Sequence, residues 1–358
     1  MVTVLLTVLV FGVLILVHEL GHFIACRIFG VRVNEFAIGM GPKIFSVESK
    51  KSKTVYSLRA FPIGGFNSIE DGINNDEEQD ENAQPLPPSE DSFAAKPVWQ
   101  RMIIIASGSF LNLVLGFIIM TVVVLATNKY ASTTIYDVYD VSGEQPVKVE
   151  SYQGLMSGDK VIEVCGRNIY TGEQLAYNIF NFGGGKVDMT VIRDGKEIVL
   201  KDVQFPTETK QGVTYGVRNF RVYTEEKNFV NTVKQSFWGG VNYIVQVFDS
   251  LVGMITGKYG IQHVSGPIGV GEAIGQAAKV GVLPLLSITV LLAMNLGVFN
   301  LLPIPGLDGG KFVFLLAEAI ARRPIPRKIE EYATMIGMAL LFGLVFIVMF
   351  KDIFTIFR

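Results

Sequence analysis

The chain has 358 residues, of which 49% are hydrophobic and 18% are charged, and its mean hydropathy is +0.39. These values are high for a soluble globular protein and indicate an integral membrane protein with some polar structure attached. The formal net charge of −2, without a basic stripe, argues against a nucleic-acid partner. The two cysteines, Cys26 and Cys165, lie far apart in the chain, which excludes a disulfide framework or a cysteine-rich zinc knuckle.

Four apolar stretches are long enough, or nearly so, to cross the roughly 30 Å of hydrocarbon in a bilayer. They predict transmembrane helices at residues 1–29, 100–127, 280–302 and 329–352. The first has no Lys or Arg before its apolar run and no small-residue cleavage site behind it, so we expect a retained helix and not a signal peptide. The predicted fold class is therefore an α-helical multi-pass membrane protein.

Basic residues gather in two connections, one between the first and second predicted spans and one between the third and fourth. The positive-inside rule places Lys- and Arg-rich connections in the cytoplasm, so we expect both on that side. The two termini and the long segment between the second and third spans would then face outward.

The pentapeptide His18-Glu19-Leu20-Gly21-His22 lies inside the first predicted span. Two histidines four apart fall on one face of a helix, where both imidazoles can reach one Zn²⁺, and Glu19 is near enough to act on a metal-bound water. An ionised Glu at the centre of a membrane helix costs about 2.5–3.5 kcal/mol on insertion scales, so it needs a partner. The alternative is a pair of packed histidines beside a helix-stabilising Glu.

A catalytic zinc site usually takes three protein ligands and keeps a fourth position for water. Asp308 is the candidate third ligand, because it is the only acid between Glu272 and Glu318 and follows a proline-rich break in the third span. Broken backbone at membrane depth is tolerated only where it is buried in protein or lines a wet cavity. Alternatively, Asp308 caps the helix expected at 309–321, a role that is compatible with metal binding. Residues 303–328 are thus read as an Asp-Gly motif and the helix that follows it.

Between the first two spans, residues 31–68 read as a β-hairpin region, with strands expected at 33–38, 43–47 and 54–58. The following segment is 69–98. Within it, residues 70–91 include nine Asp or Glu residues and no Lys or Arg. Its composition predicts a disordered acidic linker, for which a plain solvated spacer is the simplest interpretation.

Residues 129–222 read as a small β-rich domain of ordinary size. Asp194-Gly195 is a strong hairpin signal, and the stretch from Gly154 to Gly166 has the pattern of a PDZ domain. The expected elements are strands at 160–164, 187–192 and 196–200 and a helix at 171–181.

Residues 226–258 mix apolar and polar side chains, which predicts an amphipathic helix at the outer membrane surface or, alternatively, an ordinary linker between domain and membrane. His263 follows in a glycine-rich loop. It has no second candidate ligand nearby in the sequence, so we expect it to be structural or simply exposed.

Taken together, these motifs resemble those of the site-2 protease family of intramembrane zinc metalloproteases, in particular the bacterial regulator-of-sigma-factor type with a single PDZ domain. Their order and spacing make the resemblance specific. The segments that carry it are 18–22, 93–101, 108–112, 265–269 and 300–310. The chain departs from the family pattern at Ser109, where relatives often have proline.

The resemblance implies one Zn²⁺ per chain, held by His18, His22 and Asp308, with Glu19 as general base and acid. It also implies that Asn112 holds the substrate backbone. A lone amide in an apolar helix could instead make a hydrogen bond to another helix. Asn300 has the same two interpretations.

A transmembrane substrate hides its peptide bonds in its own helix, so a protease must hold it extended, which needs a strand-like template. Residues 54–66 match the family's membrane-associated β-loop and could supply an edge; alternatively, they form an interfacial hairpin that covers the site. The candidate substrate-contacting residues there are Tyr56, Phe61, Gly64, Gly65 and Phe66.

The implied function is regulated intramembrane proteolysis in the bacterial inner membrane, with the active site toward the cytoplasm. Substrates would be single-pass membrane proteins, such as anti-sigma factors or signal-peptide remnants, that another protease has trimmed first. One rival is a catalytically inactive PDZ-bearing scaffold, which the intact Glu19 disfavours. The other is a metal-ion transporter, which Asp308 disfavours as the lone acid near the third span.

Overall fold

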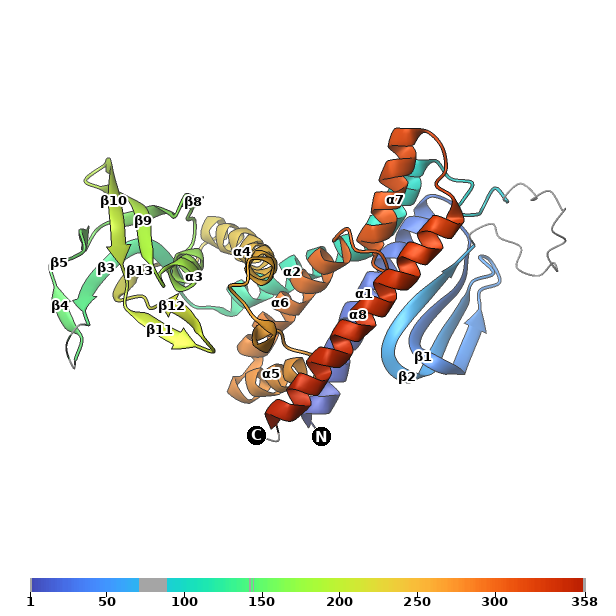
Figure 1. Ribbon diagram of the computed structural model, residues 1–358, viewed down its shortest axis with the longest axis horizontal. Coiled ribbons are helices and arrows are strands. Elements are labelled where there is room, and N and C mark those ends of the chain that lie inside the picture. The colour runs from blue at the N-terminus through green and yellow to red at the C-terminus, as the bar shows by residue number, and fades with distance from the viewer. Residues whose placement is uncertain (1, 71–88, 142, 144, 357–358) are drawn as a thin grey trace. The chain divides into compact units, whose positions relative to one another are not determined.

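The computed structural model describes residues 2–70, 89–141, 143 and 145–356. The chain forms two compact units, one made of residues 1–116 and 265–358 and the other of residues 117–264. The acidic linker predicted at 69–98 lies largely outside the described residues. Figure 1 shows the helical first unit and the β-rich second unit.

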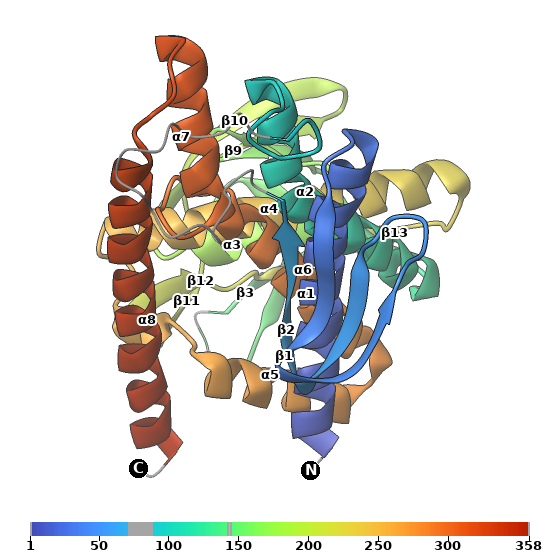
Figure 2. The same ribbon diagram turned by 90° about the vertical axis from the view of Figure 1, so that its right-hand side faces the viewer.

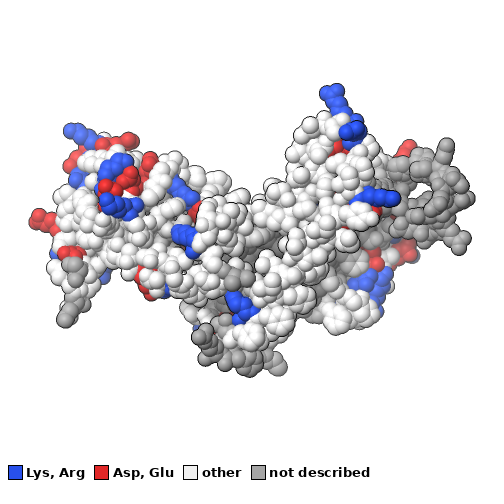
Figure 3. All heavy atoms as spheres, in the orientation of Figure 1, with Lys and Arg blue, Asp and Glu red and all other residues white. Residues whose placement is uncertain are grey.

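In the part of the chain that the structure describes, four helices are long and apolar enough to cross a membrane. They confirm the four predicted spans, and the chain is a multi-pass membrane protein. In both ribbon views α1 begins and α8 ends at the same end of the first unit, as an even number of spans requires (Figures 1 and 2). On the face that Figure 3 shows, the helical part carries few charged side chains. The four helices are α1 (Val2–Ile28), α2 (Val98–Ala126), α6 (Val282–Asn300) and α8 (Arg327–Ile356).

Between α1 and α2 the chain forms two long antiparallel strands, β1 (Val33–Glu48) and β2 (Val55–Ile69). The prediction of separate strands at 33–38 and 43–47 was wrong, because β1 runs through both. Two glycines with φ of +86° and +85°, Gly39 and Gly41, let this strand bend without interruption.

The bend folds β1 and β2 into a curled sheet in which the first part of β1 has two neighbours (Figure 2). Residues 33–38 pair with 65–69 on one side and with 55–58 on the other, and 55–58 also pair with the end of β1. Among the described residues, 65–69 have one neighbour only. This segment is therefore an edge of the sheet, whereas 55–58 are interior.

The second unit is built on a sheet in the order β10-β9-β7-β3-β13. The expected hairpin at Asp194-Gly195 is present, with φ of +48° and +75° at its two central residues. The main strands are β3 (Tyr130–Asp140), β7 (Lys160–Val164), β9 (Lys186–Arg193), β10 (Lys196–Gln204) and β13 (Phe220–Glu225). The short ones are β4 (Val147–Val149), β5 (Ser151–Tyr152), β6 (Leu155–Met156), β8 (Arg167–Asn168), β11 (Thr207–Lys210) and β12 (Val213–Gly216).

Helix α3 (Gly172–Phe182) packs on this sheet through Leu175 and Ile179, which are fully buried with the inward side chains of the strands. Thr171 caps its first turn, since the Thr171 hydroxyl accepts a hydrogen bond from the Gln174 backbone N–H. The helix predicted at 226–258 is present as α4 (Phe229–Ile255).

Two shorter helices complete the first unit. Helix α7 (Asp308–Ala321) agrees with the helix predicted at 309–321, whereas α5 (Pro267–Val280) was not predicted. Glycines lower the intrinsic helix propensity of α5 but let it approach α1 closely: a Cβ at Gly275 would lie 2.5 Å from the Thr3 side chain. A short 3₁₀ turn, Ile261–His263, precedes α5 in the chain and belongs to the second unit.

Candidate active site

The two histidines of the first motif lie on the buried face of α1, against α2. Two glycines bring the helices together, because a Cβ at Gly21 would lie 2.4 Å from the Ser107 carbonyl oxygen and one at Gly108 would lie 2.4 Å from His22 Nε2. Any side chain at Gly108 would therefore occupy the place of an imidazole. Ser109, the departure from the family pattern, is fully buried beside this contact.

Three ligand atoms converge at this point. His18 Nε2 and His22 Nε2 lie 3.2 Å apart, and Asp308 Oδ2 lies 3.1 Å from the first and 3.3 Å from the second. Ligands at about 2.0–2.1 Å from a tetrahedral zinc ion are separated by about 3.3–3.4 Å. The spacing of the three atoms therefore fits one zinc ion and leaves one side for a fourth ligand.

The hydrogen bonds around the site also favour a cation. His22 Nδ1 lies 2.8 Å from the Ile104 carbonyl oxygen, which can only accept, so Nδ1 is the donor and the neutral ring presents a lone pair at Nε2. Asp308 Oδ2 is buried and accepts no hydrogen bond from the described residues. The lone pairs of His22 Nε2 and Asp308 Oδ2 repel each other across 3.3 Å, and a bound cation removes that repulsion.

Asp308 reaches this position because the chain turns sharply between α6 and α7. Gly306, with φ of +97°, permits the turn, and a Cβ at Gly309 would lie only 2.1 Å from the Leu302 carbonyl oxygen. The cap position of α7 is Leu307, without a side-chain hydrogen bond, and Asp308 is the first helical residue. The capping role considered as the alternative for Asp308 is therefore not the one adopted.

Glu19, on α1 next to His18, is held by a residue that sequence reasoning missed. Asn67 on β2 donates from Nδ2 to Glu19 Oε2 at 2.8 Å and to the Glu19 carbonyl oxygen at 2.7 Å. Gly65, two residues earlier on the same face of the strand, lies against the Glu19 side chain. Strand alternation from Gly65 was the signal that could have directed attention to Asn67.

Asn112 is fully buried in α2, and its Nδ2 lies 3.4 Å from His18 Nδ1. This contact joins two helices, in line with the second interpretation considered for the residue. Asn112 Oδ1 has no hydrogen-bond partner among the described residues. Asn300 is the last residue of α6 and is half-buried.

The five candidate residues of the β-loop fall into two groups. Gly65 and Phe66 belong to the edge segment 65–69, and the Arg59 guanidinium lies over the Phe66 ring at 4.6 Å. Tyr56 is in the interior segment 55–58, so its backbone is already paired on both sides. Phe61 is largely exposed at the bend of the sheet, and Gly64 adopts φ of +91° there.

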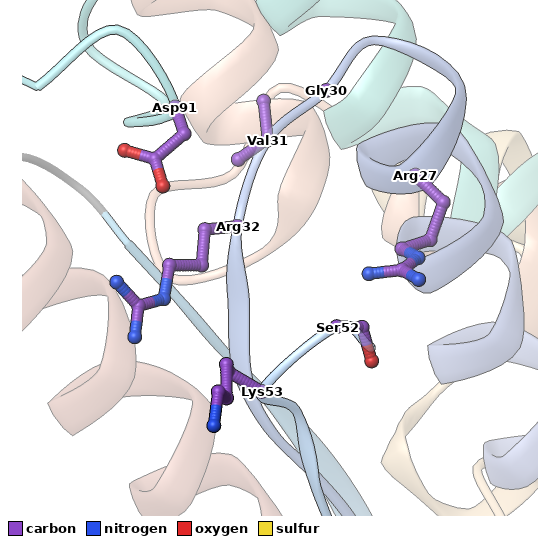
Figure 4. Close-up of a pocket in the computed structure, with 7 residues that line it drawn as sticks. All are labelled: Arg27, Gly30, Val31, Arg32, Ser52, Lys53 and Asp91. Carbon is purple, nitrogen blue, oxygen red and sulfur yellow. The ribbon is translucent and has the colours of Figure 1, made fainter. Parts of the chain in front are cut away.

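Two hollows in the first unit lie outside the ligand cluster. One, of about 360 Å³, is lined by Arg27, Arg32, Lys53 and Asp91 (Figure 4). The other, of about 690 Å³, is lined by residues of β2, α2, α7 and α8, and Asn67 forms part of its wall. His263, in the second unit, belongs to no cluster of candidate metal ligands among the described residues.

Comparison with known proteins places the chain in a family. The model of peptidase family M50 matches residues 6–344. A putative zinc metalloprotease of Clostridium perfringens is 34% identical over 351 residues, which cover 98% of both chains. A putative zinc metalloprotease of Fusobacterium nucleatum is 32% identical over an alignment of 360 positions, gaps included, that covers 99% of this chain and 100% of that protein.

A third relative is the regulator of sigma-W protease RasP of Bacillus subtilis, 27% identical over an alignment of 426 positions, gaps included, that covers 99% of each chain. These matches extend over almost the whole chain, including both segments that supply the converging ligand atoms. The chain therefore belongs to peptidase family M50, the site-2 proteases, whose cofactor is Zn²⁺.

Proposed function

We propose that the protein is an intramembrane zinc endopeptidase that hydrolyses peptide bonds in the membrane-spanning segments of other proteins. One observation carries this proposal: two imidazole nitrogens and a carboxylate oxygen, 3.1–3.3 Å apart, converge on the buried face of a helix long enough to cross a membrane. A polar cluster at such a place is functional by default.

In this mechanism His18, His22 and Asp308 hold the zinc ion. When bound, Zn²⁺ supplies Lewis-acid activation of a water molecule and of the scissile carbonyl. Glu19 takes the proton of the attacking water and later delivers it to the leaving amine. Since Asn67 engages Oε2 of Glu19, the oxygen left for this proton transfer is Oε1.

The substrate is held extended along the edge of the curled sheet. Segment 65–69 carries unpaired backbone groups on its free side among the described residues, and Gly65 packs directly on Glu19. A substrate strand that pairs with this edge is extended by main-chain hydrogen bonds, which its own helix otherwise uses. Phe66 belongs to this edge. Tyr56 lies in the interior of the sheet, so it can contact the substrate only through its side chain.

We assign the substrates to single-pass bacterial membrane proteins such as anti-sigma factors or signal-peptide remnants, trimmed beforehand by another protease. The relative named as a regulator of sigma-W supports the first group. In the same proposal, residues 129–222 form a PDZ-like domain on the outer side of the inner membrane. Both chain termini lie on that side too.

The sidedness is tested by cysteine labelling. Cysteines placed at Ser52 and Thr207 in a Cys-free background should react from opposite faces of the membrane, with position 207 reached from outside. Labelling of both positions in intact cells by an impermeant reagent would contradict the four-span orientation.

The activity is tested with purified protein and a transmembrane substrate in lipid. We expect Glu19→Gln to keep its zinc and to lose cleavage by at least about 10²-fold, the usual contribution of a general base. Glu272→Gln, the same change at an exposed acid of α5, is the matched control and should cleave normally.

A zinc-loaded wild-type protein that cleaves no membrane segment would contradict the proposed function. That result would favour the inactive scaffold instead. Undiminished cleavage by Glu19→Gln would remove Glu19 from the mechanism.

A further inference from the structure

The side chain of Asn67 is bound to Glu19 at two points. Its Nδ2 donates to the backbone carbonyl oxygen of Glu19 at 2.7 Å and to the carboxylate oxygen Oε2 at 2.8 Å. The first bond fixes the amide relative to α1, because the carbonyl belongs to the helix backbone. The second bond then holds the carboxylate in one direction relative to that backbone.

A general base needs this kind of restraint. Proton transfer requires a heavy-atom separation of about 2.6–3.2 Å, and a free Glu side chain samples many rotamers. Fixing such a side chain costs conformational entropy, and a preformed hydrogen bond offsets that cost before the reaction begins. Among the described residues, the hydrogen-bond donor to the Glu19 carboxylate is Asn67.

The position of Asn67 in the sheet links this restraint to substrate binding. Asn67 is the central residue of the edge segment 65–69, its backbone neighbour is Phe36 on β1, and its side chain points to α1. Gly65 is on the same face, and a Cβ added to it would lie 3.4 Å from Glu19 Cγ. The segment that offers a free edge to a substrate is therefore the segment that touches the general base.

We propose that Asn67 is the positioning residue for Glu19, and that it couples pairing of the substrate on the edge of β2 to the orientation of the general base. The inference rests on the proposed function, since it assigns Asn67 a part in the same hydrolysis. Substrate pairing orders the edge segment, and the Asn67 amide transmits that order to the Glu19 carboxylate.

The geometry specifies what other side chains do at this position. Alanine removes the donor. Aspartate keeps the shape of Asn67 but has no N–H and adds a negative charge beside Glu19, so it repels the carboxylate that Asn67 holds. Serine keeps a donor on a shorter side chain and restores part of the contact.

The test measures kcat, KM and zinc content for Asn67→Ala, Asn67→Asp and Asn67→Ser in the full-length protein reconstituted in lipid, with a transmembrane substrate. We expect kcat to fall by about 10- to 100-fold in Asn67→Ala, further in Asn67→Asp and less in Asn67→Ser. KM should change by less than about threefold and zinc should remain at one per chain, because no metal ligand is touched.

Asn34→Ala is the matched control. Asn34 on β1 also donates an amide N–H to a carboxylate, Glu70 Oε2 at 3.0 Å, directly after the end of β2, and no hydrogen bond joins it to Glu19. This variant removes a bond of the same kind and should keep the wild-type kcat.

The inference is overturned by equal kcat in Asn67→Ala and wild type, by an equal loss in Asn34→Ala, or by a loss that follows zinc content. Failure of the proposed function is a separate result, since wild-type protein would then show no cleavage at all. An order other than Ser, Ala, Asp from the smallest to the largest loss would also contradict the hydrogen bond as the cause.

Discussion

Two carboxylates, one in each unit of the protein, are treated in opposite ways by their surroundings. The Asp249 carboxylate on α4 accepts hydrogen bonds from both terminal nitrogens of the Arg167 guanidinium at 2.7 Å and from the Tyr177 hydroxyl at 2.8 Å. Asp308 on α7 faces two imidazole nitrogens, and its Oδ2 accepts no hydrogen bond from the described residues. Both side chains are mostly buried, at 12% and 20% exposure.

The contrast separates a structural carboxylate from one that is kept for a ligand. A buried charge costs free energy unless it is paired, so a complete set of donors, as at Asp249, stabilises the fold by itself. An incomplete set, as at Asp308, is stable only when something else completes it. Lone pairs that converge in a buried place are stabilised by a cation, and we propose that the family's zinc is the cation at this site.

The largest expected effect concerns metal binding. We expect His22→Ala and Asp308→Ala to lose most of their zinc, because two ligands hold the ion far more weakly than three. Asp249→Ala removes the carboxylate that has a complete set of hydrogen-bond donors, and this variant should keep one zinc per chain. Metal analysis after purification measures this, and full zinc occupancy in Asp308→Ala would remove Asp308 from the ligands.

The next effect concerns Asn112, which contacts His18 on the side of the ring that faces away from Asp308. A rotation of its amide by 180° would bring Oδ1 to His18 Nδ1, so that the imidazole carries its proton there and offers Nε2 to the metal. We then expect Asn112→Leu to weaken zinc affinity by about 10- to 100-fold, measured by competition with a chelator.

The same variant also tests the role that the family implies for Asn112. If Asn112 holds the substrate backbone instead, zinc affinity stays at the wild-type value. Cleavage of a helical substrate then falls more than cleavage of one with Gly or Pro near the scissile bond, because those residues already weaken the substrate helix.

A smaller effect is expected at Asp249, the carboxylate with a complete set of hydrogen-bond donors. Asp249→Ala leaves the Arg167 guanidinium and the Tyr177 hydroxyl without their partner, which should cost about 2 kcal/mol of local stability. Hydrogen exchange of α3 and β8 measures the cost. Asp188→Ala, which breaks a largely exposed pair with Lys201, is the control and should change exchange much less, because water screens that pair. Equal costs would mean that completeness of the donor set does not matter.

The smallest effect depends on pH and concerns Glu35 on β1. Burial raises its pKa, but hydrogen bonds from Ser57, Lys43 and Arg59 outweigh burial and lower the pKa from 4.5 to about 2. Because the folded state has the lower pKa, this stabilisation is present above pH 4.5 and is lost as the pH falls from there toward about 2.

At neutral pH the stabilisation by Glu35 amounts to at most about 3 kcal/mol. We expect Glu35→Gln to speed hydrogen exchange of β1 and β2 at pH 7, and the difference from wild type to shrink below pH 4. Glu48→Gln, at a 56% exposed position of the same strand, should change exchange little at either pH. A difference between Glu35→Gln and wild type that is independent of pH would contradict the charge as its source.

The features that depend on local pattern could be predicted from the amino-acid sequence. The four spans follow from runs of apolar residues, and α1, α2, α6 and α8 lie within a few residues of the predicted bounds. The pairing of His18 with His22 follows from the helical repeat, and the hairpin at Asp194-Gly195 follows from turn chemistry. All of these depend on neighbours only a few residues away.

The tertiary structure alone decided what depends on distant neighbours. Residues 55–58 and 65–69 have similar strand patterns, yet only the second lies at an edge, because the bend at Gly39 and Gly41 places β1 between them. Asn67 and Glu19 are far apart in the chain, and no local pattern links them. Their contact exists because β2 packs along α1, and packing of that kind is set by the whole fold.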